Sequence, residues 1–282
     1  MNSIKNIYLN WLLFALYLVA LFTFPITILG SYLGFALGAT ISLVFLFSLA
    51  IKAEEKIEAK LKLESLTVAE EPELYHTLNE FSRRLNIATP NLRLLKSEAL
   101  TVGAYGLFRN SSYIIVSEGL LKAMNRPQMI ALLARELTAI WYGDALLSTW
   151  LSRFFSALEF FSFQTQNRRT SHLKKRYSLN WVLSQIVFLP LALIPQFLLL
   201  RVRNQVNLSK ESLKISHLPL ELAESFRKIE ASLHRKLFYA PLSLTPLFLV
   251  SPTSGDPISR LLFSEKLKQT LLNSLTEPAE QT

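Results

Sequence analysis

Cysteine is absent from this chain of 282 residues, and histidine occurs only four times. Without cysteine the protein can form neither disulfides nor thiolate metal sites, a composition compatible with a reducing compartment. The histidines are His76, His172, His217 and His234. No two of them are spaced to share one face of a helix, so the sequence offers no evident histidine pair for a metal ion.

Charged residues are also scarce, at 18% of the chain, whereas hydrophobic residues make up 50% and the mean hydropathy is +0.28. This balance favours an integral membrane protein. The net charge of +9 includes a dense group of cations at residues 168–176, between two apolar runs. Because of that position we expect these cations to face anionic lipid headgroups, and we expect no nucleic-acid partner. Neither a G-x-S-x-G serine motif nor a phosphate-binding glycine loop is present.

Two apolar runs without charge, residues 7–29 and 32–51, open the chain. Each has about 20 residues, enough to cross roughly 30 Å of hydrocarbon as a helix. Only two residues separate the runs, so we predict an N-terminal transmembrane hairpin over residues 7–51.

A second apolar pair, residues 146–163 and 179–200, lies within a predicted membrane-associated region at residues 146–200. Its first member carries Arg153 and Glu159, which are costly at the bilayer centre unless they are paired or face a cavity. The cations between the two runs oppose the positive-inside tendency if both runs span. Two interpretations therefore stay open, a pair of spans and an interfacial or re-entrant pair.

Between these regions we predict a small α+β domain at residues 53–145, completed by residues 201–276, with a polar tail at 277–282. Its predicted elements are a helix at 70–85, strands at 91–95 and 113–116, and a helix at about 126–144 that Asn125 can cap.

The segment of residues 131–144, ALLARELTAIWYGD, is similar to the helix of a zinc metalloprotease. Such a helix carries H-E-x-x-H, in which two histidines one turn apart grip one ion. Here Arg135 and Ala139 stand at the histidine positions, and Glu136 stands at the glutamate. A guanidinium and a methyl group cannot coordinate zinc.

Further segments follow in the order of a known family. They are residues 100–106, residues 113–121, the matching positions Glu136, Leu137, Ile140, Gly143 and Asp144, residues 203–207, and the Leu-Phe-Ser of residues 262–264. Over residues 9–275 the chain resembles the HtpX-like family of membrane zinc metalloproteases, which is grouped with the CaaX prenyl proteases.

The resemblance implies an α+β zincin-like fold, mainly helical, combined with transmembrane helices. A returning helix that reads R-E-x-x-A-D in the family would supply the third zinc ligand. Asn204 stands at that ligand position here, and Asn207 at the position of the acidic partner. We therefore expect no cofactor and no metal, and interpret Glu136 as a catalytic remnant. The guanidinium of Arg135 could replace the lost positive charge or extend to solvent. Because neighbouring residues on a helix point about 100° apart, we expect Asp144 or a residue near Asn204 to be an easier partner for it than Glu136.

The resulting hypothesis is a catalytically inactive membrane pseudoprotease that binds membrane-protein segments or a membrane partner in protein quality control. We expect it in the lipid bilayer of a bacterial cytoplasmic membrane, with the protease-like domain in the cytoplasm. Two alternatives stay open, an active zinc endopeptidase with non-standard ligands, which alone would require zinc, and a structural subunit of a membrane complex.

A retained peptide cleft would be formed by the strand Tyr113, Ile114, Ile115 and Val116 together with Asp144 and Asn207. An exposed strand can pair its backbone with an extended peptide. The alternative is an internal strand that is paired on both sides.

Overall fold

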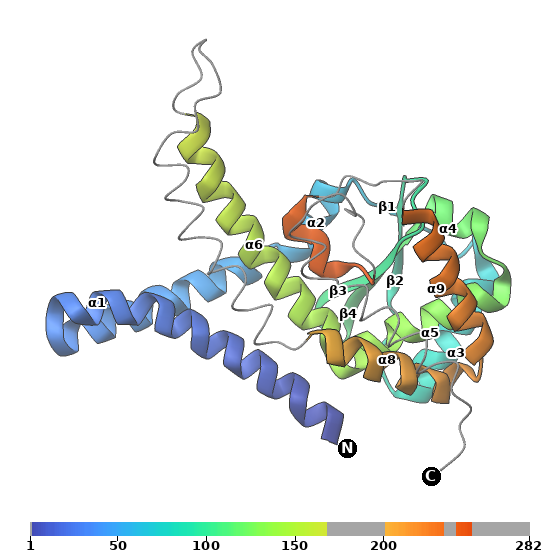
Figure 1. The fold of residues 1–282 in the computed structure, drawn as a ribbon, viewed down its shortest axis with the longest axis horizontal. Helices are drawn as coiled ribbons and strands as arrows, with labels where there is room; N and C mark the ends of the chain where they lie inside the picture. The colour runs from blue at the N-terminus through green and yellow to red at the C-terminus, as the bar shows by residue number, and fades with distance from the viewer. Residues whose placement is uncertain (1, 168–200, 234–240, 250–282) are drawn as a thin grey trace.

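The computed structural model describes residues 2–167, 201–233 and 241–249. Its helices are α1 (Asn2–Ala50), α2 (Ala53–Leu61), α3 (Pro72–Leu85), α4 (Glu118–Ala123), α5 (Arg126–Tyr142), α6 (Asp144–Asn167), α8 (Arg201–Ser216), α9 (Pro219–Leu233) and the 3₁₀ helix η1 (Leu242–Leu247). Its strands are β1 (Glu64–Ser65), β2 (Asn91–Leu95), β3 (Val102–Phe108) and β4 (Ser111–Ser117). Figure 1 shows a domain built around the sheet, from which α1 and α6 project.

The ribbon of α1 doubles back at the end that lies farthest from the sheet (Figure 1). Large apolar side chains on its second half are 45–70% exposed: Phe35, Leu37, Ile41, Leu43, Val44 and Phe47. Among the described residues no single helix is long and apolar enough to cross a membrane. The segments Phe35–Ala50 and Ala53–Leu61, bent by 51° at their junction, meet that criterion only as a pair.

The sheet has the strand order β1-β2-β4-β3. β4 pairs in parallel with β2 on one side and antiparallel with β3 on the other, whereas β1 pairs antiparallel with the far side of β2. β4 is therefore an interior strand, and β3 is the edge strand nearest α5 and α6.

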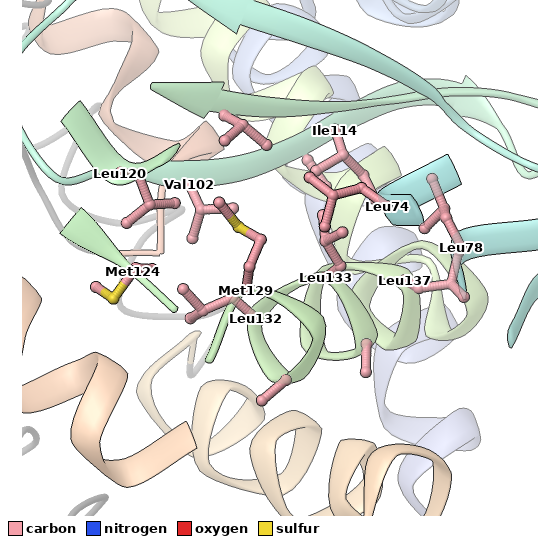
Figure 2. Close-up of a cluster of buried hydrophobic side chains, with 14 of the residues drawn as sticks. Leu74, Leu78, Val102, Ile114, Leu120, Met124, Met129, Leu132, Leu133 and Leu137 are labelled. Carbon is pink, nitrogen blue, oxygen red and sulfur yellow. The ribbon is translucent and has the colours of Figure 1, made fainter. Parts of the chain in front are cut away.

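Alternating side chains of the sheet enter two apolar clusters, as the two-residue period of a strand requires. On one face, Ile114 and Val116 pack with leucines of α3 and α5, as Figure 2 shows for part of this cluster. On the other face, Ile115 and Tyr105 pack with α2 and with residues in and after η1. The second cluster places the segment after η1 against β3, close to the candidate site.

Helix α5 begins at a capping box, in which the Asn125 side chain accepts from the backbone N–H of Gln128 while the Gln128 side chain accepts from the N–H of Asn125. It ends at Gly143, whose φ of 87° favours glycine. Asp144 begins α6 instead of ending α5, which corrects the predicted end of this helix.

The predicted strand at 91–95 is confirmed as β2, and the helix predicted at 70–85 is confirmed as α3, two residues shorter at its start. The run at 179–200 and the segments at 168–176 and 262–264 lie outside the described residues.

Candidate functional site

The middle of α5 is enclosed on all sides, by the sheet, α3, α8 and α9. Arg135 and Glu136 expose only 2% and 1% of their surface, and Ala139 exposes 3%. The three positions at which a zinc protease helix carries its H-E-x-x-H residues therefore lie in the interior of this protein. The interpretation that Arg135 extends to solvent is wrong.

The guanidinium of Arg135 forms a buried ion pair, through Nη1, with the Glu136 carboxylate. This pair corrects the expectation that Asp144 or a residue near Asn204 is an easier partner than Glu136. The long arginine side chain spans the 100° between neighbouring positions. The Nε and Nη2 of Arg135 are buried and find no hydrogen-bond acceptor among the described residues. These two buried nitrogen donors lack a partner in the part of the chain that the structure describes, and this lowers the free energy of unfolding.

A very small pocket adjoins this ion pair. It offers about 10 Å³ of space to the centre of a water-sized sphere, roughly what a single water molecule needs. It is lined by Ala104 of β3, by Arg135, Glu136 and Ala139 of α5, by Asp144, Ala145 and Ser148 of α6, and by Leu247 and Phe248. Asp144 exposes 4% of its surface, since it lies where α6 turns away from α5. The pocket brings three acidic or basic side chains together, but it is smaller than the roughly 300–1,000 Å³ of typical ligand pockets.

Helix α8 packs against the C-terminal half of α5, where Leu208 joins a cluster with Ala139 and Tyr142. Tyr142 donates a hydrogen bond to Glu211, and burial together with this carboxylate raises the pKa of Tyr142 to about 12. Asn204 and Asn207 lie in the first turns of α8, and their side chains lie outside what the structure describes. The helix that resembles the family's returning helix therefore lies against the helix that resembles its zinc helix.

The predicted cleft strand, Tyr113–Val116, does not form an open edge. It lies in β4, whose backbone pairs with β2 and β3 at every one of these four positions. The prediction of peptide pairing through this strand is therefore wrong, and the alternative of an internal strand is correct. The pairing partners come from distant parts of the sequence, which local strand propensity cannot identify.

The outer edge of β3 is covered by the chain's own residues. Gly103 forms an antiparallel bridge with Phe248, and the N–H of Leu249 donates to the carbonyl of Val102 at 2.9 Å. Further along, the N–H of Gly106 donates to the Thr149 hydroxyl at 2.9 Å. An added Cβ at position 103 would meet the carbonyl oxygen of Leu247 at 2.3 Å, so this close approach requires glycine.

The residues at the zinc positions do not fit a zinc ion. Arg135 places a cation where the ion would lie, Ala139 supplies no donor atom, and the Glu136 carboxylate already binds Arg135. In the described part of the chain, no group of three or more His, Cys, Asp or Glu residues could hold a metal. His76 and His217 lie outside the pocket lining, whereas His172 and His234 fall outside the described ranges.

The model of peptidase family M48 matches residues 69–209, from the start of α3 into α8. The chain belongs to peptidase family M48. Its similar relatives include "Protease HtpX homolog" from Pelotomaculum thermopropionicum, 26% identical over 95% of this chain and 98% of the relative. Another homolog of the same name, from Nostoc, is 22% identical over 89% of this chain and 88% of the relative. A third, from Leptothrix cholodnii, is 32% identical over 43% of this chain and 42% of the relative. The HtpX-like resemblance is thereby confirmed.

Proposed function

We propose that this chain is a non-catalytic HtpX-like protein of the membrane, which retains the M48 architecture and has lost its metal chemistry. The observation that carries this proposal is the buried ion pair between Arg135 and Glu136. It occupies the position at which a zinc protease needs a ligand and a free general base. Asn204, at the position of the third ligand, is consistent with the same loss.

The chemistry of hydrolysis requires an activated water. Zinc would lower the pKa of a bound water, and a neighbouring glutamate would accept its proton. In this chain the Glu136 carboxylate accepts a hydrogen bond from Nη1 of Arg135, and the pocket beside it has only about 10 Å³ of space for the centre of a water-sized sphere. These side chains hold one another in place and close the interior of the domain, a structural role.

The membrane location is supported by the exposed apolar side chains of α1 and by two charge-free runs in residues 7–29 and 32–51. Exposed apolar surface of this extent is typical of a face that meets lipid or another protein. We propose that α1 lies in a bacterial cytoplasmic membrane and that the M48 domain lies on the cytoplasmic side.

The proposed role is the binding of a membrane protein or of its segments, in membrane-protein quality control. The predicted cleft strand is interior and the edge of β3 is covered. We therefore assign the partner surface to α1, because this helix exposes large apolar side chains. The second half of this helix presents Val44 and Phe47, which are 64% and 70% exposed.

A protease assay with a matched variant tests the loss of activity. The purified chain should leave a casein-like substrate intact, and Glu136→Gln should behave in the same way as the parent. Cleavage by the parent that Glu136→Gln abolishes would establish the active endopeptidase instead.

A photo-crosslinker at position 44 tests the partner role in intact cells. It should form adducts with other membrane proteins, whereas the same probe at position 220, an exposed leucine of α9, should form few. One constant adduct of fixed stoichiometry would instead indicate a structural subunit of a membrane complex.

A further inference from the structure

Helix α2 separates two of its three glutamates, Glu54 and Glu58, from its lysines. Glu54 and Glu58 point toward the sheet, where Glu54 accepts from the N–H of Leu107 at 3.2 Å and Glu58 accepts from Arg93 at 3.0 Å. Lys52 precedes the helix, and Lys56 and Lys60 follow on one side of it at intervals of four residues. Glu54 and Glu58 therefore form hydrogen bonds with residues of the sheet and lie on the side of α2 opposite the lysines.

Helix α6 adds a cation to the lysine side of α2. Arg153 donates from Nε to the carbonyl oxygen of Leu49 at 3.2 Å, which holds its guanidinium at the C-terminal end of α1. Lys60 donates to the hydroxyls of Ser243 at 2.8 Å and Ser156 at 3.4 Å, which holds α2 against α6. We call Lys52, Lys56, Lys60 and Arg153 the junction cluster.

Like charges spaced four residues apart on a helix repel one another. Some of the repulsion is relieved at Lys52, which lies 3.3 Å from Glu55, an exposed pair that contributes little. The pKa of Lys56 is lowered by a small loss of hydration and by the charges of Arg153 and Lys52. Within the described residues no carboxylate forms an ion pair with Lys56. The cluster thus gathers more positive charge than its acidic neighbours balance.

The position of the junction cluster indicates which anion it meets. It lies at the 51° bend that follows Phe35–Ala50, and Figure 1 shows α1 and α6 crossing near this point. The exposed apolar side chains of α1 are followed by exposed Ile51, which directly precedes Lys52. Apolar surface directly followed by clustered cations matches an acyl chain joined to a phosphate headgroup.

We propose that the junction cluster binds the headgroup of an anionic phospholipid, with the acyl chains lying along the exposed face of α1. This inference rests on the proposed membrane location and names the lipid class that this location requires. Lys56 and Arg153 bind the headgroup phosphate, and the glycerol and acyl chains extend toward Phe47. A zwitterionic lipid binds less tightly because its own amine meets the same cations.

Native mass spectrometry of the full chain in a neutral detergent tests the proposal, with phosphatidylglycerol and phosphatidylcholine added in separate arms. We expect retained phosphatidylglycerol to exceed phosphatidylcholine. Lys56→Gln should lower that retention about fivefold, as expected for one cation near an anionic surface. Lys56→Arg should restore it. The matched control is Lys62→Gln, which removes the same charge at the exposed end of α2 and should retain lipid as the parent does.

Equal retention of the two lipids, or an equal loss in Lys56→Gln and Lys62→Gln, would overturn the assignment. A third arm adds inorganic phosphate in excess. It should not displace phosphatidylglycerol, because it lacks acyl chains, and displacement would overturn the lipid as the ligand. Recovery of the chain in the soluble fraction of cells would instead contradict the membrane location on which this inference rests.

Discussion

The guanidinium of Arg135 binds the carboxylate of Glu136, the next residue along α5, and both side chains are at least 98% buried. A buried ion pair contributes little net stability, because the loss of hydration offsets the attraction. Breaking one by removing a single partner leaves an uncompensated charge in the interior. The main effect of the pair is therefore that each side chain balances the charge of the other in the interior of the domain.

This relationship predicts a non-additive mutation series. Glu136→Leu alone should destabilise the protein by about 3–5 kcal/mol, since Arg135 then remains buried without its partner. Arg135→Met combined with Glu136→Leu should recover most of that loss, because two buried donors of Arg135 that lack an acceptor among the described residues are removed as well. Chemical denaturation in one detergent measures both. A double variant as unstable as the single one would contradict the interpretation.

The zinc site should be recoverable only as a set. We expect Arg135→His, Ala139→His and Asn204→Glu together to restore measurable zinc affinity, because the two histidines then lie one turn apart on α5 and α8 packs beside them. Each single reversion should bind no more zinc than the parent. Calorimetric titration with zinc checks this. Tight binding by the Ala139→His variant alone would show that other ligands already converge there.

The sequence predicted some of these features and missed others for identifiable reasons. Asn125 marked the start of α5, and the polar turns that flank residues 91–95 marked β2 as a short strand, because both signals are local. β3 was missed, since Gly103 and Gly106 weaken a strand pattern. Strand pairing is non-local, so the interior position of β4 could not be read from residues 113–116.

The partner of Arg135 was equally hard to predict. Nearly every residue in the middle of α5 is buried, so the helix has no polar face from which the direction of a charged side chain could be inferred. The family resemblance identified positions 135, 136 and 139 as a group. That Arg135 pairs with Glu136 depends on how the surrounding helices pack, which the resemblance does not give.

Glycine at position 103 should be essential to the closed edge of β3. In Gly103→Ala the new methyl group meets the Leu247 carbonyl oxygen at 2.3 Å, and backbone atoms must move. We expect a loss of about 1–3 kcal/mol, typical of overpacking, and faster proteolysis within residues 241–249. Leu249→Pro, which removes the N–H that donates to Val102, should have a similar effect. Leu249→Ala keeps that donor and serves as the control. Equal cleavage rates in all four proteins would show that this segment does not depend on its pairing with β3.

Tyr142 should make stability depend on pH in alkaline solution. Its pKa is about 12 in the folded protein, against an ordinary value of about 10 in the unfolded chain. The folded state therefore holds this proton more tightly. Its contribution is fully present below pH 10 and is lost as the pH rises from about 10 to 12. Unfolding measured across this range should show the loss in the parent.

Tyr142→Phe should not show this alkaline loss of stability. In Glu211→Gln the loss should begin at lower pH, because the carboxylate charge that raises the pKa of Tyr142 is removed. A parent and a Tyr142→Phe variant with the same alkaline pH profile would contradict the linkage between α5 and α8 through this hydrogen bond.

The most direct test of the central claim is the zinc content of the full chain, purified without chelator in mild detergent and measured by elemental mass spectrometry. The loss of all three ligands predicts no stoichiometric zinc, and no change in content when zinc is supplied during growth. One zinc per chain, removable by a chelator with loss of proteolysis, would contradict it.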